Sequence, residues 1–444
     1  MRPRPVPCLT PALGGGPAPN IVIIYADDLG YGEPPCYGGR VPMPAMDRLA
    51  REGCRFADAH AAAALCSPSR YALLTGRYPW RTPMGGRILA DHAPLAIEPS
   101  RMTVPSLLRE HGYRTAAVGK WHLGFGSDPD QTALPEPLRP GPLETGFDSY
   151  FGIPVSHNRP PFIWVEDHQA LGRGGVECRR IGGYEIGPQR VDDEVGPILS
   201  AQAVATIERL QAEPFFLYLA TAAVHIPITP APAFRGRSGS GPYQDFVMEF
   251  DATVAAVLET LDRCGIAERT LVIVSSDNGP TGGGATGPLR GEKKSAYEGG
   301  HRLPFLARWP SRIPPGLSSA QTLSHADLLA SFAAMLGATL PEGAGEDSCD
   351  MHAALLGQQA DAGAPSLRPA GLVTVSNQHV LTLRDGPWKL IDAPQPELYD
   401  LAADLGETRD LARVQPARVA AMRATLDLYR QHGRSRPGRA ACEG

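Results

Sequence analysis

The stretch NIVIIYADD, residues 20–28, runs through apolar residues and ends in two aspartates. A continuous Val/Ile run is typical of a strand buried on both faces, as in a parallel sheet. The same pattern returns far along the chain in TLVIVSSDNG, residues 270–279. Two further apolar runs, PFFLYLATAAVH (214–225) and YRTAAVGKWHLG (113–124), end in a histidine and in Lys and His. We expect four strands of one sheet, each followed by polar residues.

Segments with helical spacing of apolar residues separate these strands. They cover residues 43–53, 104–112, 199–212 and 246–265. Alternation of strands and helices predicts an α/β fold, with a large, mostly parallel mixed sheet sandwiched by helices. Ligands of such sheets bind at the carboxyl ends of the strands. The polar residues at the four strand ends are therefore expected to meet in one site.

The sequence also suggests a domain organisation. We expect a disordered N-terminal segment (1–19), a catalytic α/β domain (20–340) and a connecting segment (341–368). Short strand-like pieces and a closing helix then predict a small α+β C-terminal subdomain (369–432), followed by a flexible tail (433–444).

Composition excludes several classes of protein. The chain has 444 residues, 43% of them hydrophobic and 20% charged, with a formal net charge of −5. These values are typical of a globular protein and argue against nonspecific nucleic-acid binding. We expect no membrane span, and the N-terminus lacks the apolar core of a signal peptide, which suggests a cytoplasmic location. The eight cysteines form no C-x-x-C pair, and we expect mostly free thiols.

The two acid-rich strand ends offer only oxygen ligands. Asp27 and Asp28 follow the first strand, and Asp277 and Asn278 follow the strand at 270–276. Three carboxylates brought together would repel one another without a counter-charge. Hard divalent cations prefer such ligands, so these four residues predict a site for Ca²⁺, with Mg²⁺ as the alternative.

A cysteine precedes a helix start in LCSPSRYALLTG, residues 65–76. We expect Ser67 as the N-cap, Pro68 as the first helical residue and Gly76 as the stop. The helix N-terminus and Arg70 would together stabilise an anion at position 66, either a thiolate or a group derived from the cysteine.

The stretch CSPSRYALLTGRYP matches the pattern C-x-P-x-R-x-x-x-x-T-G, and the chain thereby resembles the type I sulfatases of the alkaline phosphatase superfamily. The resemblance extends through IVIIYADDLGYG and KSAYEGGHRLPFLARWP to WKLI, and is nearest to the arylsulfatase A-like branch. It implies that Cys66 is oxidised to formylglycine by a formylglycine-generating maturation enzyme. It also implies hydrolysis of an aryl or carbohydrate sulfate ester, and relatives are often exported.

The resemblance assigns a role to each matching residue. Residues implied as metal ligands are Asp27, Asp28, Cys66 as formylglycine, Asp277 and Asn278. Residues implied in catalysis are Cys66, Arg70, Lys120, His122, His225, Asp277 and Lys293, and those implied in substrate binding are Lys120, Ser156, His225 and Lys293.

The expected chemistry divides these residues by task. Arg70, Lys120, Lys293 and the cation would offset charge on the sulfate. Asp277 would take the proton of the attacking hydroxyl, and His225 or Lys293 would protonate the leaving alcohol. His122 would deprotonate the second hydroxyl and so release sulfate.

Two alternatives remain open at this point. A phosphodiesterase or phosphonate monoester hydrolase of the same superfamily would use similar residues. A non-catalytic binding protein would keep Cys66 unmodified. The sequence does not decide the natural ester or the oligomeric state.

Overall fold

One large sheet organises the computed structural model, which describes residues 18–172, 177–358, 366–368 and 370–436. Its eleven strands follow the order β12-β2-β11-β10-β1-β9-β3-β4-β5-β6, with β13 beside β2. The central strand β1 (Asn20–Ala26) pairs in parallel with β10 (Thr270–Ser276) and β9 (Phe215–Ala220). Strand β3 (Arg114–Lys120) pairs in parallel with β9. The four predicted strands are therefore adjacent and point in the same direction.

Burial on both faces explains the continuous apolar runs. Ile21, Ile23 and Tyr25 of β1 belong to one hydrophobic cluster, whereas Val22 and Ile24 belong to another on the opposite face. Successive side chains of a strand point to opposite faces, so an apolar residue is needed at every position.

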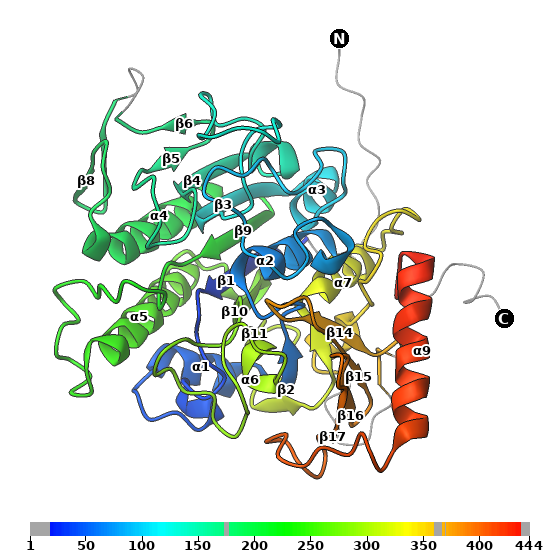
Figure 1. Ribbon diagram of the computed structural model, residues 1–444. Coiled ribbons are helices and arrows are strands. Elements are labelled where there is room, and N and C mark those ends of the chain that lie inside the picture. The colour runs from blue at the N-terminus through cyan, green and yellow to red at the C-terminus, as the bar shows by residue number, and fades with distance from the viewer. Residues whose placement is uncertain (1–17, 173–176, 359–365, 369, 437–444) are drawn as a thin grey trace.

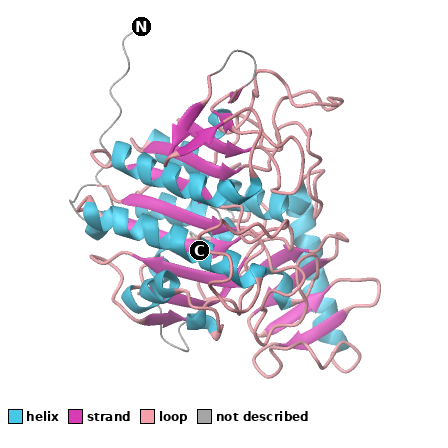
Figure 2. Ribbon diagram, turned by 90° about the vertical axis from the view of Figure 1, so that its left-hand side faces the viewer, coloured by secondary structure: helices cyan, strands magenta, loops and turns pink. Residues whose placement is uncertain are grey.

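Helices cover both faces of the sheet, as Figure 1 shows. The cluster around Val22 includes residues of α1, α4 and α5, and the cluster around Ile21 includes residues of α2, α3, α7 and α8. Figure 2 shows the strands of the large sheet stacked with helices alongside. The helices are α1 (Pro44–Glu52), α2 (Cys66–Thr75), α3 (Val104–Glu110), α4 (Val195–Leu210), α5 (Pro242–Arg263), α6 (Glu298–His301), α7 (Leu328–Met335), α8 (His352–Leu355) and α9 (Pro416–His432).

The edges of the sheet are mixed in direction. Strand β11 runs antiparallel to β10 and β2, and β5 runs antiparallel to β4 and β6. The remaining strands of this sheet are β2 (Cys54–His60), β4 (Ser149–Ile153), β5 (Val165–Glu166), β6 (Gln169–Ala170), β11 (Arg302–Arg308), β12 (Leu317–Ser319) and β13 (Leu323–Ser324). A separate hairpin is formed by β7 (Arg179–Ile181) and β8 (Tyr184–Ile186).

A small antiparallel sheet and α9 form the C-terminal part of the fold. Its strands are β14 (Leu372–Val375), β15 (Leu381–Asp385), β16 (Trp388–Ile391) and β17 (Glu397–Asp400). Ala63, three residues before Cys66, forms a bridge with Val375 of β14. The two residues also share a hydrophobic cluster with Tyr78 and with Leu426 of α9. The small sheet thus packs directly beside the segment that leads into α2.

The predicted fold class is confirmed, whereas the predicted domain boundaries stay predictions. Residues 1–17 and 437–444 lie outside the described residues. Within the predicted connecting segment, Asp347 is buried and forms an ion pair with Arg81. At the start of the predicted tail, Ser435 is buried and donates a hydrogen bond to Asp347.

The six cysteines within the described residues are free thiols, whereas Cys8 and Cys442 lie outside them. Among the described helices, none combines the length and apolar character that a membrane crossing requires.

Candidate active site

The four parallel strands bring their polar ends to one edge of the sheet. Asp27 and Asp28 follow β1, and Asp277 and Asn278 follow β10. Backbone hydrogen bonds fix these ends together, because Asp27 N–H donates to Ala223 O and Asp277 N–H donates to Ala26 O, at 2.9 and 3.1 Å. Asp28 and Asn278, which are 250 positions apart in the sequence, therefore lie side by side.

Helix α2 presents Cys66 to this edge, but it begins differently from the prediction. Its first residue is Cys66 and its N-cap is Leu65, which is extended and has no side-chain cap. The Ser67 hydroxyl instead accepts a hydrogen bond from the Leu89 N–H at 3.3 Å, so it is not available as a cap. The predicted stop is confirmed, since Gly76 is left-handed with φ 64°.

The Cys66 thiol is fully buried, and burial raises its pKa despite the nearby Lys120 and Lys293 ammonium groups. The thiolate form of the sequence expectation is therefore not favoured by the groups of this chain. A group derived from the cysteine stays the prediction.

Arg70, one turn into α2, is anchored on the carboxylate of Asp277. Its Nη2 and Nε donate to Asp277 Oδ2 at 2.7 and 3.1 Å, and its Nη1 donates to the carbonyl of Lys120 at 3.1 Å. The other oxygen of Asp277, Oδ1, accepts the N–H of Asp28 at 3.1 Å. Asp277 is thus held by a fixed cation and by the backbone of the neighbouring strand end.

Two lysines enter the site from different elements, and each pairs with one aspartate. Lys120, at the end of β3, lies 2.7 Å from Asp27 Oδ2, and Lys293 lies 2.5 Å from Asp28 Oδ1. Burial alone would raise the pKa of Asp27, but Lys120 and the other nearby cations hold it below its usual value. Asp27 therefore stays ionised in a buried site.

Three buried oxygens of the site have no hydrogen-bond partner among the described residues. They are Oδ1 of Asp27, Oδ2 of Asp28 and Oδ1 of Asn278. The amide of Asn278 is oriented by its Nδ2, which donates to Asp28 Oδ1 at 2.7 Å and to Gly279 O at 2.8 Å. Buried oxygens without a partner are costly unless a cation or a donor reaches them. These residues therefore fit a hard divalent cation.

Ligand atoms of Asp27, Asp28, Cys66 and His225 all lie within 4.8 Å of one another. His225, predicted only as a catalytic and substrate-binding residue, thus also borders the cation site. Its Nδ1 lies 2.6 Å from the carbonyl of Ile226, and its Nε2 lies 3.8 Å from Asp28 Oδ2. A carbonyl oxygen only accepts hydrogen bonds, so Nδ1 carries a proton, and Nε2 is the ring nitrogen that faces the site.

His122 faces the same site from the segment after β3. Its Nδ1 lies 3.3 Å from the hydroxyl of Ser156, whereas its buried Nε2 has no partner among the described residues. Burial, followed by the charge of Lys120, lowers the pKa of His122 well below its usual value, so the imidazole is neutral at neutral pH. A neutral ring with an open nitrogen can accept a proton.

Two of these residues adopt left-handed backbone conformations. Asp28 has φ 65° and His122 has φ 55°. Such conformations are strained for residues other than glycine and persist where the surrounding structure enforces them. Each occurs two residues after a strand ends, where the chain turns into the site.

Sequence reasoning missed a second buried polar group behind the site. His60, Glu298 and His301 also lie within 4.8 Å of one another. Here Lys389 of β16 fills the space, at 3.0 Å from Glu298 Oε1 and 3.3 Å from His301 Nε2. Arg302 pairs with Glu298 Oε2 at 3.2 Å. The WKLI motif contains this lysine, but its partner lies 91 positions earlier and only the fold shows the contact.

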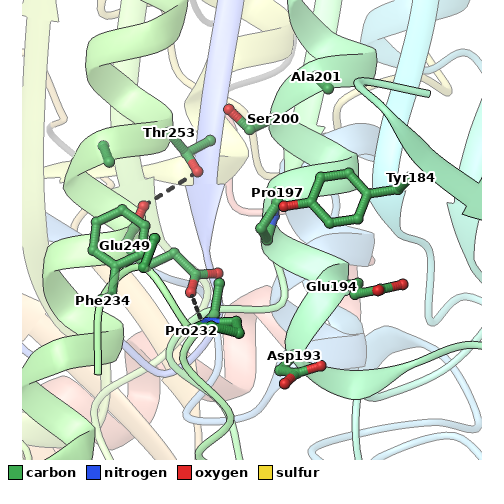
Figure 3. Close-up of a pocket in the computed structure, with 13 residues that line it drawn as sticks. Tyr184, Asp193, Glu194, Pro197, Ser200, Ala201, Pro232, Phe234, Glu249 and Thr253 are labelled. Atoms are coloured by element: carbon green, nitrogen blue, oxygen red, sulfur yellow. Dashed lines mark hydrogen bonds between the residues drawn. The ribbon is translucent and has the colours of Figure 1, made fainter. Parts of the chain in front are cut away.

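A cavity of about 630 Å³ lies apart from these residues, between α4 and α5 (Figure 3). The side chains of Tyr184, Phe234 and Glu249 line it, and none of the predicted site residues does.

Comparisons with known proteins agree with this geometry. The model of the family described as Sulfatase matches residues 19–338. An N-acetylgalactosamine-6-O-sulfatase of Bacteroides thetaiotaomicron is 33% identical, over 92% of this chain and 92% of its own length. Human arylsulfatase A is 38% identical over 76% of this chain and 68% of its own length. A solved protein from work on glycosaminoglycan metabolism in Bacteroides thetaiotaomicron has a TM-score of 0.85 and 32% identity, covering 94% of this chain and 100% of that one.

The sheet, the strand-end acids and the buried cysteine at a helix start define a hydrolase with the alkaline phosphatase-like fold. With the family match over residues 19–338, the chain belongs to the sulfatase family. It is a sulfuric ester hydrolase, which confirms the predicted class and excludes the non-catalytic alternative.

Proposed function

We propose that this sulfatase hydrolyses the sulfate ester of a carbohydrate, using a formylglycine derived from Cys66 and one divalent cation, with Ca²⁺ preferred over Mg²⁺. Carbohydrate is favoured over a simple aryl ester by the relative that matches 92% of this chain, an N-acetylgalactosamine-6-O-sulfatase. The solved protein with a TM-score of 0.85 comes from work on glycosaminoglycans and supports the same class.

The residues that would hold the cation are Asp27, Asp28, Asp277, Asn278 and the modified residue 66. When present, the cation and the formylglycine hydrate would supply charge stabilisation and a nucleophilic hydroxyl. The preference for calcium rests on the all-oxygen donors of the strand ends, which suit a hard cation with several ligands.

Charge balance supports an anionic substrate. The buried site holds three carboxylates, of Asp27, Asp28 and Asp277, which are matched by three cations, Arg70, Lys120 and Lys293. A divalent cation added to this neutral set leaves excess positive charge in a buried place. A sulfate monoester carries the negative charge that would offset it, and the lysines would lie beside its oxygens.

The proton-moving roles follow from the state of each side chain. Neutral His122, with Nε2 open, would accept a proton when sulfate is expelled. His225 and Lys293 both border Asp28 and remain the two candidates for protonating the leaving alcohol. Asp277 would take a proton from the attacking hydroxyl, with Arg70 keeping its carboxylate in place. Ser156 would orient His122 and contact the substrate.

The observation that carries this proposal is the set of buried oxygens without partners, on Asp27, Asp28 and Asn278, beside a fully buried cysteine at the start of α2. Buried oxygens without a hydrogen bond are costly, and a bound cation would offset that cost here.

The test is mass spectrometry and kinetics on protein produced with and without a formylglycine-generating enzyme. The peptide that contains Cys66 should become lighter by roughly 18 Da in the first preparation only. Sulfated sugars should be turned over only by that preparation, and Cys66→Ala should lose turnover while keeping its melting temperature.

Substantial activity of Cys66→Ala would contradict the assigned nucleophile. A higher kcat/KM on aryl phosphonates or phosphate diesters than on every sulfate ester would instead favour the phosphonate monoester hydrolase alternative.

A further inference from the structure

Lys294 differs from every other lysine of the chain. The sequence contains four lysines, and Lys120, Lys293 and Lys389 are buried in ion pairs. Lys294 is exposed, and its ammonium has no hydrogen-bond or ion-pair partner among the residues that the structure describes. The exposed Glu292, two positions earlier, forms no ion pair with it there. This cation is therefore available to a ligand.

The backbone of Lys294 is fixed beside the nucleophile position. Its N–H donates to Ala64 O at 2.8 Å, and its carbonyl accepts the N–H of Asn377 at 3.2 Å. Ala64 stands two residues before Cys66. Lys294 has φ 80°, a conformation that glycine adopts without strain and lysine does not. A lysine kept at a position that suits glycine indicates that its side chain is used.

The hairpin that holds Lys294 also carries His379. Residues 376–380 connect β14 to β15, and His379 is exposed within them. The N–H of Gly86 donates to His379 Nδ1 at 3.4 Å, so a neutral ring carries its proton on Nε2. The Nε2–H of His379 is a second donor on the hairpin that contacts Lys294.

Arg87 provides a third donor, from the loop that lies against this hairpin. A side chain at Gly86 would come within 2.0 Å of Ser376 O, so the loop lies against the hairpin. Arg87 follows, is exposed, and has no side-chain partner among the described residues. The loop is held next to the nucleophile because Leu89 N–H donates to Ser67 Oγ at 3.3 Å.

We propose that Lys294, Arg87 and His379 form a second anion-binding subsite at the rim of the active site. It would bind an anionic group of the substrate other than the sulfate that is hydrolysed. This inference rests on the proposed function, and it narrows the substrate to a sulfated carbohydrate with a further acid group, either a carboxylate or a second sulfate. The buried cations would bind the sulfate that is hydrolysed. The exposed donors would bind the second anionic group and so determine which sugar is preferred.

The test compares kcat/KM on three substrates that share one sulfated monosaccharide. The first is the free sugar, the second is linked to a uronic acid, and the third carries a second sulfate. The wild type should prefer the second or the third, and the preferred one identifies the source of the anion. Lys294→Gly and Arg87→Gln should each lower kcat/KM about tenfold on that substrate through KM, and less than twofold on the free sugar.

Lys294→Gly is the decisive variant because it removes the charge and also relieves the backbone strain. Its melting temperature should be equal to or above that of the wild type, so a loss of preference could not be assigned to unfolding. Arg209→Gln is the matched control. Arg209 is exposed near the end of α4, which leads into the amino end of β9, so it lies at the opposite edge of the sheet from Cys66.

Binding to Cys66→Ala, measured by calorimetry, separates this inference from the sulfatase reaction. Tighter binding of the doubly charged sugar that Lys294→Gly abolishes would support the subsite even without turnover. Equal binding of all three sugars, or equal losses on all three in the variants, would overturn it. Absent turnover of every sulfate ester by modified wild-type protein would count against the proposed function alone.

Discussion

Two buried groups of acids and histidines in this protein differ in how their carboxylate oxygens are paired. At the strand ends, Asp27 and Asp28 each pair one oxygen with a lysine, and the other oxygen of each has no hydrogen-bond partner among the described residues. Behind them, Glu298 gives one oxygen to Lys389 and the other to Arg302, so both of its oxygens are paired. The first group is open to a cation, and the second is closed by cations of the chain itself.

The difference shows that residue types alone do not define a metal site. Both groups place ligand atoms within 4.8 Å of one another, and both are fully buried. What separates them is Lys389, whose ammonium comes from the C-terminal sheet and occupies the place of an ion. A buried charge without a partner is costly, so the unpaired oxygens are the informative feature.

A third treatment of a buried carboxylate occurs in the cavity between α4 and α5. Glu249 accepts the N–H of Ala231 at 2.6 Å with one oxygen, and its other oxygen has no partner among the described residues. None of the described residues that line this cavity is a lysine or arginine, and burial raises the pKa of Glu249 to about 7. Figure 3 shows its side chain reaching from α5 toward the loop at Pro232. Here a proton neutralises the buried carboxylate, whereas a lysine or a metal ion would do so in the other two groups.

The largest effect should come from removing one charge of the open group. We expect Asp28→Asn to lower kcat/KM roughly a thousandfold or more, because the cation and Lys293 both lose their counter-charge. Calcium binding, measured by calorimetry, should weaken in parallel. The matched change in the closed group is Glu298→Gln, which should leave calcium affinity unchanged. An equal fall in calcium affinity in both variants would contradict the proposal that only the group at the strand ends binds the cation.

A smaller effect should follow from opening the closed group. Lys389→Met leaves Glu298 buried with one cation fewer, and we expect the free energy of unfolding to fall by about 3 kcal/mol. Lys389 also pairs with the buried Glu407 at 2.8 Å, so the double variant Lys389→Met/Glu298→Gln should recover only part of this loss, because one of the two carboxylates that Lys389 neutralises is then uncharged. Urea denaturation of the wild type, Lys389→Met and the double variant measures these free energies of unfolding. A double variant no more stable than Lys389→Met would show that packing, not charge, dominates there.

The smallest effect concerns Glu249 and depends on pH. Its carboxyl has a pKa of about 7 in the folded protein, against 4.5 for an ordinary glutamate, so between these pH values the folded state binds a proton that the unfolded chain has lost. Stability contributed by the protonated form is present below pH 4.5 and is lost as the pH rises through 7. Glu249→Gln should therefore be more stable than the wild type at pH 8, by on the order of 2 kcal/mol, and similar at pH 4.5.

Melting curves of both proteins across this range test the Glu249 prediction. Asp251, whose pKa burial raises to about 6, titrates in the same direction in both proteins and cancels from the difference. A difference in stability that does not change with pH would contradict a protonated Glu249.

Much of the fold and the site could be predicted because it follows from local pattern. The apolar runs at Ile21 and Leu271 define parallel central strands, and parallel strands place Asp27 and Asp277 at one edge. The predicted start of α2 was wrong. The helix begins at Cys66, and the Ser67 hydroxyl accepts a hydrogen bond from the loop at Leu89 instead of capping the helix. No local pattern shows such a competitor.

Local pattern also could not show the pairing of Lys389 with Glu298, because it joins β16 of the small C-terminal sheet to helix α6, 91 positions earlier in the chain. The same limit applies to the antiparallel β11, which returns between β10 and β2. The assigned roles of the site residues stay predictions, and their juxtaposition is what the fold adds.

The complete burial of Cys66 would set a time limit on the oxidation proposed for it. Once the chain is folded, helix α2 is buried along its whole length and the thiol is inaccessible to any other protein. The bridge between Ala63 and Val375 cannot form until the ribosome has made residue 375. Synthesis at about 5–20 residues per second leaves roughly 15–60 s after position 66 emerges. A maturation enzyme would have to act on the nascent chain within that interval, so slower folding should raise the modified fraction.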